Sequence, residues 1–311
     1  MKKYLLTLFS IPLLIFATEE EDFTNLQAHY QHKNWNKIIS NSTLMLKQYP
    51  ESIFSKDVLF FTAVAYFHFD DPSVSNDYLT KFLEKDGNSR YFEEALKYKY
   101  FIAEKFENGY YGHLWGVQAL PRLESMWQEA YLLYDEVIMT LPRSDVAAKA
   151  LFRKSCMYLK DDKFDESIEG YSSLIRRFSN NPLAQESYVQ IMKAYKQQIK
   201  VQYLDPKCYE FALLNKKRFE LAYPSSPLKI EMEEAALDII DLYAEDIYKS
   251  ALYFDKKQKI ESAIMYLQSL VAKYPSSRYA SLAVQKIAAY NLDNFKQLKQ
   301  SPDTSVLIGA E

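Results

Sequence analysis

The stretch Tyr274-Pro275-Ser276-Ser277 decides the fold class of this chain, because versions of it recur along the sequence. Each version follows one apolar segment with helical periodicity and precedes another. Proline cannot continue a helix, since it lacks an N–H group and clashes with the preceding turn. A serine or asparagine two residues later can accept hydrogen bonds from the first free N–H groups of the next helix. The phrase therefore predicts the end of one helix and the start of the next.

Six such phrases divide the chain into helical segments of similar length. Their second positions are residues 50, 87, 142, 179, 224 and 275, which lie roughly 37 to 55 residues apart. A repeat of about 34 to 50 residues built from two helices is typical of an α-solenoid. We therefore predict an all-α fold of about six helix pairs and a C-terminal closing helix. The expected helices are 23–32 and 35–48, 53–69 and 75–84, 91–107 and 123–140, 145–159 and 164–177, 183–201 and 207–222, 228–254 and 260–273, and 279–298.

Three segments that begin second helices share a pattern that supports this pairing. Residues 34–39, 163–168 and 259–264 each have an aromatic or aliphatic anchor at their second position and an isoleucine at their last. Ser167 and Ala263, which follow the anchors of the later two segments, are small enough to let two helices approach closely. The pattern resembles the second helix of the tetratricopeptide repeat, although the tryptophan and glycine of that repeat's first helix are missing. The resemblance implies a chain of tetratricopeptide-like helix pairs.

The N-terminal sequence predicts export. Residues 1–3 are short and basic, residues 4–17 form an apolar run, and acidic residues follow from Glu19. An apolar run of this length suits a signal peptide better than a membrane-spanning helix. We expect cleavage after Ala17, delivery to the periplasm or to the periplasmic face of the outer membrane, and a mature solenoid over 18–300. A buried or interfacial first helix is the alternative. The polar, non-periodic residues 301–311 are expected to form a disordered tail.

Two repeat phrases resemble those of the BamD-type outer-membrane assembly factors. Residues 46–52 and 271–277 are similar to phrases that close repeats in that family, and the likeness covers residues 26–106 and 244–290. It implies a periplasmic scaffold that supports insertion of β-barrel proteins into the outer membrane, with barrel-assembly subunits as partners. Two features depart from the family. No cysteine follows the apolar run to carry a lipid, so any membrane association would be peripheral and through partners, and residues 145–222 add about one repeat. A repeat adaptor for cell-wall synthesis or division, or a chaperone of exported proteins, is the alternative function.

Few residues in the sequence suggest chemistry. His29 and His32 have a spacing that could share a metal, but Asp22 is the only candidate third ligand nearby in sequence, and two exposed histidines on a short helix are the commoner case. Carboxylates occur as alternating charge along helices, the formal net charge is −3, and no block of like charge marks a nucleic-acid surface. We therefore expect no catalytic residue, cofactor, metal or nucleic acid. Cys156 and Cys208 fall on non-neighbouring helices, which favours buried free thiols over a disulfide.

One segment, residues 108–123, interrupts the regular repeats. It carries three of the six glycines, interleaved with aromatic residues, at a place where a tight turn is expected. Long loops with apolar content often have a function, and exposed aromatic residues often anchor protein partners. The segment predicts either a partner-binding insertion or internal padding of the neighbouring helices. The candidate partner-binding residues are Tyr110, Tyr111, Leu114 and Trp115.

Overall fold

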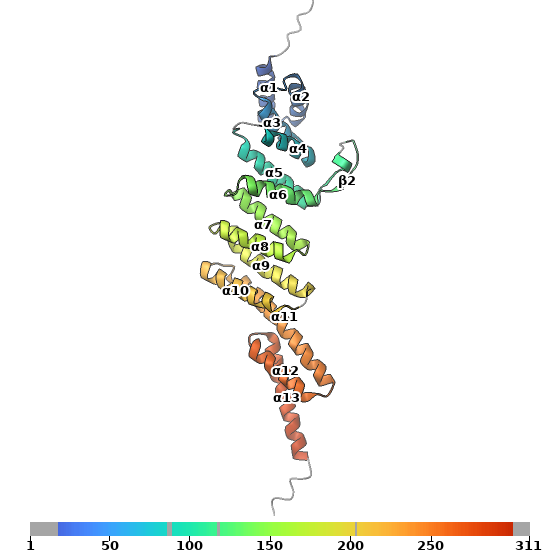
Figure 1. Ribbon diagram of the computed structural model, residues 1–311, viewed down its shortest axis with the longest axis vertical. Helices are drawn as coiled ribbons and strands as arrows, with labels where there is room; N and C mark the ends of the chain where they lie inside the picture. Colours follow the sequence, from blue (N-terminus) through green and yellow to red (C-terminus); the bar gives the residue numbers. More distant parts are fainter. Residues whose placement is uncertain (1–17, 86–88, 117–118, 203, 301–311) are drawn as a thin grey trace, which may run out of the picture. The chain divides into compact units, whose positions relative to one another are not determined.

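The computed structural model describes residues 18–85, 89–116, 119–202 and 204–300, with the side chains of all of these except Trp115 and residues 292–300. The described part contains thirteen α-helices and one short β-hairpin (Figure 1). The predicted all-α solenoid of tetratricopeptide-like helix pairs is confirmed. The chain divides into two compact units, at residues 1–142 and 143–311. The expected signal peptide at 1–17 and the expected disordered tail at 301–311 lie outside the described residues.

The first unit consists of three helix pairs. Each helix packs on the next, and the first helices of successive pairs also contact one another, α1 with α3 and α3 with α5. The helices are α1 (Glu19–Gln31), α2 (Trp35–Gln48), α3 (Ser55–His68), α4 (Pro72–Glu84), α5 (Phe92–Glu107) and α6 (Trp127–Thr140). The hairpin is inserted within the third pair, between α5 and α6. It consists of β1 (Tyr111–His113), a 3-10 turn (Leu114–Gly116) and β2 (Arg122–Ser125).

The second unit consists of three further pairs and the closing helix. Contacts again run from each helix to the next and between the first helices of neighbouring pairs, α7 with α9, α9 with α11, and α11 with α13. The helices are α7 (Asp145–Lys160), α8 (Phe164–Arg177), α9 (Pro182–Val201), α10 (Pro206–Ala222), α11 (Lys229–Lys256), α12 (Ile260–Lys273) and α13 (Arg278–Gln300). None of the helices among the described residues is long and apolar enough to cross a membrane.

The recurring phrases act as helix starts, as the sequence predicts. In all six, the serine or asparagine side chain accepts a backbone N–H from two or three residues further on, at 3.0 to 3.2 Å. The pairs are Ser52 with Phe54, Ser89 with Tyr91, Ser144 with Ala147, Asn181 with Leu183, Ser226 with Leu228, and Ser277 with Ala280. In three of the phrases the side chain belongs to the residue just before the helix and caps it, as the sequence predicts: Ser144, Asn181 and Ser277. In the other three, Ser52, Ser89 and Ser226 bind the N–H of the residue that directly precedes α3, α5 or α11, and those helices have no side-chain cap.

The turns inside four of the pairs use a left-handed residue that is not glycine. Lys33, Asp70, Asp162 and Gln258 all have φ between 55° and 57°, and the second helix begins two residues after each. This conformation brings the Cβ atom close to the following carbonyl oxygen and costs about 1 kcal/mol for a residue with a side chain. The sequence does not indicate these positions, because it lacks the glycines that usually mark them.

Aromatic rings fill the space between successive pairs of the first unit, as the abundance of tyrosine and phenylalanine suggests. The ring of Tyr30 on α1 stacks on Phe61 of α3 with centroids 4.3 Å apart. The neighbouring Phe60 stacks on Tyr91, just before α5, at 4.5 Å. Such ring pairs stabilise a fold beyond their buried area by about 0.5 to 1.5 kcal/mol each.

One cation is enclosed in the same unit. Lys99 on α5 is only 1% exposed, and its Nζ donates to Glu136 Oε2 on α6 at 2.6 Å and to Thr80 Oγ1 on α4 at 2.9 Å. Burial lowers the pKa of Lys99, while the hydrogen bond to the Glu136 carboxylate and its charge oppose that shift. Lys99 thus connects three consecutive helices through a buried charge.

Two helix boundaries differ from the expected ones for identifiable reasons. Helix α1 starts at Glu19 rather than at residue 23, because Thr18 and Glu21 form a reciprocal capping box. Helix α6 starts at Trp127 rather than at residue 123, because residues 122–125 pair with β1 as a strand. The remaining helix ends agree with the expected ones within three residues.

Both cysteines are free thiols, as predicted. Cys208 is buried and Cys156 is partly buried, with its Sγ atom 3.0 Å from the Tyr171 hydroxyl. Burial, followed by the charges of Asp205 and Asp165, raises the pKa of the Cys208 thiol.

Candidate functional site

The inserted segment of the first unit is a two-stranded antiparallel hairpin rather than an irregular loop. Tyr111 pairs with Ser125 and Gly112 with Glu124, and an irregularity in register follows Gly112. A Cβ atom at position 112 would lie 2.6 Å from the sulfur of Met126, so a side chain there would require the Met126 side chain to move. The glycine therefore lets β1 approach the start of α6 closely.

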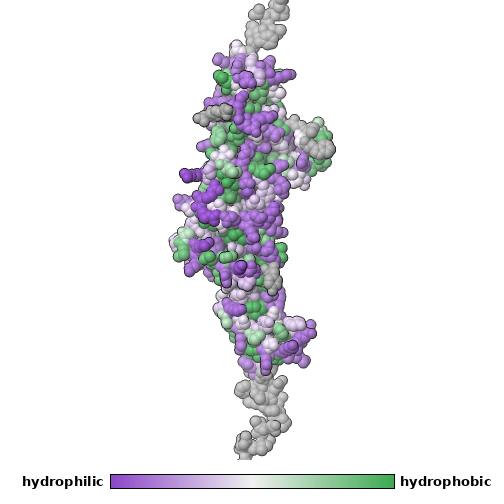
Figure 2. All heavy atoms as spheres, in the orientation of Figure 1, coloured by the Kyte–Doolittle hydropathy of each residue, from purple (hydrophilic) through white to green (hydrophobic). Residues whose placement is uncertain are grey.

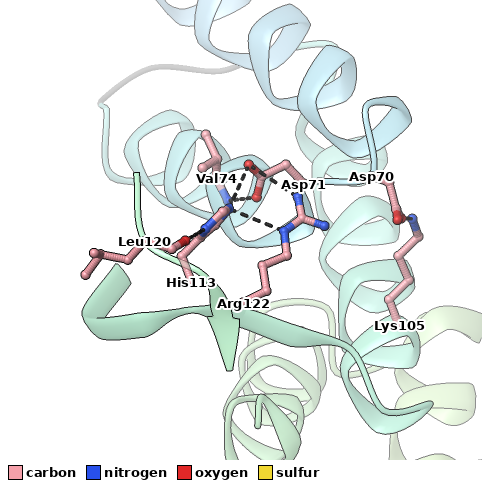
Figure 3. A network of polar contacts seen from close by, with 7 residues as sticks. All are labelled: Asp70, Asp71, Val74, Lys105, His113, Leu120 and Arg122. Atoms are coloured by element: carbon pink, nitrogen blue, oxygen red, sulfur yellow. Dashed lines mark hydrogen bonds and ion pairs between the residues drawn. The ribbon is translucent and has the colours of Figure 1, made fainter. Parts of the chain in front are cut away.

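The hairpin is fixed to the corner between α3 and α4 by polar contacts (Figure 3). The carboxylate of Asp71 lies 3.8 Å from His113 Nε2 and 3.9 Å from an Arg122 nitrogen, and it also accepts the Val74 N–H at the start of α4. His113 Nδ1 lies 2.7 Å from the carbonyl oxygen of Leu120, and Arg122 Nε donates to His113 Nε2 at 3.3 Å. Asp71 is thus shared between the cap of α4 and the base of the hairpin.

The four candidate partner-binding residues have different surroundings. Tyr110 faces inward, stacking on Phe106 with ring centroids 5.6 Å apart and lying under the Arg122 guanidinium. Tyr111 is 54% exposed, and Leu114 is half-buried. The side chain of Trp115 lies outside the described part. The segment therefore combines inward packing at Tyr110 with an exposed aromatic ring at Tyr111, and partner binding by the four residues stays a prediction.

A cavity of about 450 Å³ opens between α4, the hairpin and the first turns of α6, and we call it the hairpin cavity. Its volume falls within the range of about 300 to 1,000 Å³ that is usual for ligand pockets. It lies within the first unit. Its lining consists of Ser73, Val74, Asn76, Asp77, Phe106, Gly112, His113, Gly116, Glu124, Met126, Glu129, Leu132 and Leu133.

The polar groups of the hairpin cavity are mostly acceptors. The Oδ1 atom of Asn76 is buried and has no hydrogen-bond partner among the described residues. Asp77, Glu124 and Glu129 bring carboxylates from α4, β2 and α6. Enclosure at the edge of the cavity raises the pKa of Asp77, while the charge of Lys81 opposes that shift. These residues gave no sequence signal, because α4 and α6 lie about fifty residues apart and their carboxylates have the spacing of ordinary solvated helix faces.

A second cavity, of about 380 Å³, lies in the second unit between α10, α11 and α12. Tyr209, Tyr243 and Tyr274 line it, with ring centroids 5.3 to 6.3 Å apart, and the Tyr243 hydroxyl donates to the Asp205 carbonyl oxygen at 2.5 Å. Burial raises the pKa of Tyr243. Tyr274 belongs to the phrase that opened the sequence argument, so the aromatic residue of the phrase packs against the preceding helices.

The other three histidines, His29, His32 and His68, lie at the ends of helices. His68 stacks on Trp35 with ring centroids 4.4 Å apart, and burial, then Lys33 and Lys105, lowers its pKa. His32 is exposed at the end of α1, whereas His29 is half-buried one turn earlier. The described residues include no group of three or more side chains arranged to hold a metal ion.

Residues 247–277 match the tetratricopeptide repeat family. The chain therefore contains a tetratricopeptide repeat. The matched segment covers the end of α11, all of α12 and the phrase that ends at Ser277, so the family match and the helix-pair geometry agree on this repeat. No curated protein matches the chain significantly.

Several solved structures of repeat proteins are similar to this chain at low identity. The C-terminal part of a tetratricopeptide repeat-containing protein from Cytophaga hutchinsonii shares 13% identity, with 84% of this chain and 98% of that chain covered and a TM-score of 0.34. The tetratricopeptide domain of P58(IPK) shares 12%, with 87% and 77% covered and a TM-score of 0.29. The Rap conjugation gene regulator of plasmid pLS20, in complex with the Phr* peptide, shares 11%, with 90% and 80% covered and a TM-score of 0.30. These values are too low to transfer a property to this chain.

Proposed function

We propose that this protein is a non-catalytic interaction scaffold of the cell envelope that supports assembly of outer-membrane β-barrel proteins. The tetratricopeptide repeat is generally a protein-interaction scaffold, and stacked helix pairs offer extended surfaces for other polypeptides. The repeat fold is the observation that carries the proposal. Large apolar side chains also remain accessible beside the hairpin, with Leu123 and Leu132 each 66% exposed. Figure 2 shows apolar residues interspersed with hydrophilic ones on the face in view.

The envelope location is supported by the N-terminal sequence and by the start of the first helix. Cleavage after Ala17 would leave Thr18 in place, and Thr18 is the residue that caps α1. The new amino group at Thr18 would lie beside the four acidic residues of the first turn of α1, which would offset its unfavourable interaction with the helix dipole. The proposed mature chain would thus keep the whole of α1 and its cap.

The role in barrel assembly is supported by the resemblance of residues 46–52 and 271–277 to phrases of the BamD-type factors. In the structure both phrases follow a second helix and precede the next first helix. Ser277 caps α13, whereas Ser52 accepts the N–H of Phe54 in the turn before α3. The partners in this role would be subunits of the barrel-assembly machinery. An adaptor for cell-wall synthesis or division, or a chaperone of exported proteins, would use the same fold with other partners.

Crosslinking in intact cells followed by affinity purification tests this proposal. The full-length protein carries a C-terminal tag, and a tagged exported protein of unrelated fold serves as the control. We expect barrel-assembly subunits to be enriched over that control. Enrichment of peptidoglycan synthases or division proteins instead would support the alternative role, and a purification without any barrel-assembly subunit would refute the assembly role.

Fractionation and N-terminal sequencing test the location separately. We expect a mature chain that starts near Thr18 and is released from membranes by alkaline or high-salt washing. A mature protein that retains Met1, or that resists such washing, would contradict the proposal.

A further inference from the structure

We propose that the hairpin cavity binds a basic side chain, arginine or lysine, of a partner polypeptide. The inference rests on the proposed scaffold function and specifies the chemistry of one contact. It is carried by three features of the cavity: its apolar floor, the carboxylates at its rim, and a buried acceptor without a donor.

The floor of the cavity suits the aliphatic stem of a long side chain. Phe106 and Leu133 are 1% and 5% exposed, and Met126 covers the base of the hairpin beside them. Lysine and arginine bury their methylene groups against such surfaces while their charged ends stay near polar groups. A cavity with this floor favours an amphipathic occupant over a small inorganic ion.

The rim supplies negative charge from three separate elements. Asp77 on α4, Glu124 on β2 and Glu129 on α6 all line the cavity, and none of them has an ion pair within 4 Å among the residues that the structure describes. The positive charges of two lysines act on Asp77. Lys81 lies on the same helix, and Lys99 is bound to Glu136. The carboxylates are therefore available to a cation that enters from outside.

The interior of the cavity presents an acceptor that needs a donor. The Oδ1 atom of Asn76 is buried and has no hydrogen-bond partner among the described residues, so a donor from a ligand would satisfy it. A guanidinium group offers five N–H donors and an ammonium group three, and neither has an acceptor. The arrangement thus favours a cationic donor and disfavours an acidic peptide.

Methyl NMR on the full-length protein tests the proposal directly. The Met126 methyl group, labelled with carbon-13, reports on the floor of the cavity and is assigned from the Met126→Leu variant. The probe is the blocked tripeptide acetyl-Leu-Arg-Leu-amide, and the matched control is the same tripeptide with citrulline, which has nearly the same shape and no charge. We expect saturable shifts of the Met126 signal with the arginine peptide and at least about tenfold weaker binding of the citrulline peptide.

Variants of the rim locate the binding. Asp77→Asn and Glu124→Gln should each weaken binding of the arginine peptide by about threefold, as expected for partly exposed ion pairs. Glu93→Gln removes an exposed carboxylate from α5, away from the cavity, and should leave binding unchanged. The other methionine signals should stay in place in all three variants, which shows that the fold is intact. Equal affinity for the arginine and citrulline peptides, or equal effects of all three variants, would overturn the proposal.

The outcome can be separated from that of the proposed function. If the arginine peptide fails to bind while crosslinking still captures barrel-assembly subunits, the cavity inference is wrong and the scaffold role stands. If the peptide binds as expected while no such subunit is captured, the cavity contact stands and the assembly role fails.

Discussion

The buried ion pair between Lys99 and Glu136 allows a quantitative test of how the first unit is held together. Replacing Glu136 by glutamine keeps the shape of the side chain and removes its charge, which leaves the Lys99 ammonium enclosed between α4, α5 and α6. Removing one partner of a fully buried pair typically costs about 3 to 5 kcal/mol. The side chain of Glu136 is 35% exposed, so water screens part of the interaction. We therefore expect a loss of about 2 to 3 kcal/mol.

Replacing Lys99 by methionine should have a much smaller effect. The change removes the cation together with the cost of burying it, and replaces it by an apolar side chain of similar length. Substituting a buried charge by a well-packed apolar group is often neutral or stabilising. We expect the Lys99→Met variant to stay within about 1 kcal/mol of the parent. Adding Glu136→Gln to it should then cost less than about 0.5 kcal/mol, because no buried charge is left unpaired.

Native-state hydrogen exchange measured by mass spectrometry is the suitable assay. Stacked repeats unfold in parts, so a single global transition does not report the stability of one region. Peptides from α5 and α6 should lose protection in Glu136→Gln and regain it in the double variant, while peptides from the second unit serve as the internal control. A Lys99→Met variant as unstable as Glu136→Gln, or an equal cost of Glu136→Gln in both backgrounds, would refute the account of the buried charge.

The same pair predicts a dependence on alkaline pH. Burial lowers the pKa of Lys99 in the folded state, so between that pKa and the unfolded value of about 10.4 the unfolded state binds more protons. The contribution of Lys99 to the free energy of unfolding therefore rises with pH in this window. The buried tyrosines act in the opposite direction, because their raised pKa values make the fold less stable as pH rises. The difference in stability between the parent and Lys99→Met should shift in favour of the parent as pH rises from about 8 to 10. A difference that stays constant would contradict this.

Three further changes test other features of the fold. Gly170→Ala should destabilise the contact of α8 with α7, because the new Cβ atom would clash with Ser155 Oγ. Overpacking costs about 1 to 3 kcal/mol against about 1 kcal/mol gained in helix propensity, and Ser155→Gly should relieve it. Denaturation of Gly170→Ala, Ser155→Gly and the double variant should show that the two effects on the free energy of unfolding differ from additivity by at least about 0.5 kcal/mol. Asp162→Gly should stabilise the turn between α7 and α8 by about 1 kcal/mol, seen as a higher melting temperature, because glycine adopts the left-handed conformation without strain. Tyr111→Ala should change stability by no more than about 0.5 kcal/mol, whereas Tyr110→Ala should cost more than about 1 kcal/mol by the same measurement.

The helix pairs could be predicted from the sequence because their boundaries depend on local chemistry. A helix end at Pro275 and a helix start at Ser277 need only the properties of those residues and their near neighbours. The same holds for Ser144 and Asn181, whose side chains cap α7 and α9 as expected. The phrase therefore carries its structural meaning wherever it occurs, and a fold built from its repetition can be read from one sequence.

The hairpin could not be predicted in the same way. Strand β1 has only three residues, too few for an alternating pattern, and all four residues of β2 are exposed. The close approach of Gly112 to Met126 depends on where α6 begins, and the strand pairing itself delays that start to Trp127. The sequence thus identifies an unusual segment at 108–123 but cannot show that its end continues as a strand to Ser125.

The hairpin cavity follows from one local contact of Asp71 and two contacts of Asp71 that are distant in sequence. Asp71 caps α4 and holds His113 and Arg122, so the position of the hairpin is set by the same residue that starts the helix on the opposite wall. The inward face of the hairpin then brings Glu124 to the rim shared with Asp77, and the outward face leaves Tyr111 exposed. Asn76, whose buried Oδ1 atom has no hydrogen-bond partner among the described residues, lines the same cavity as three carboxylates. The arrangement is better explained by a second polypeptide that supplies the missing donor, and neutralising the rim should then weaken that contact without disturbing the repeats.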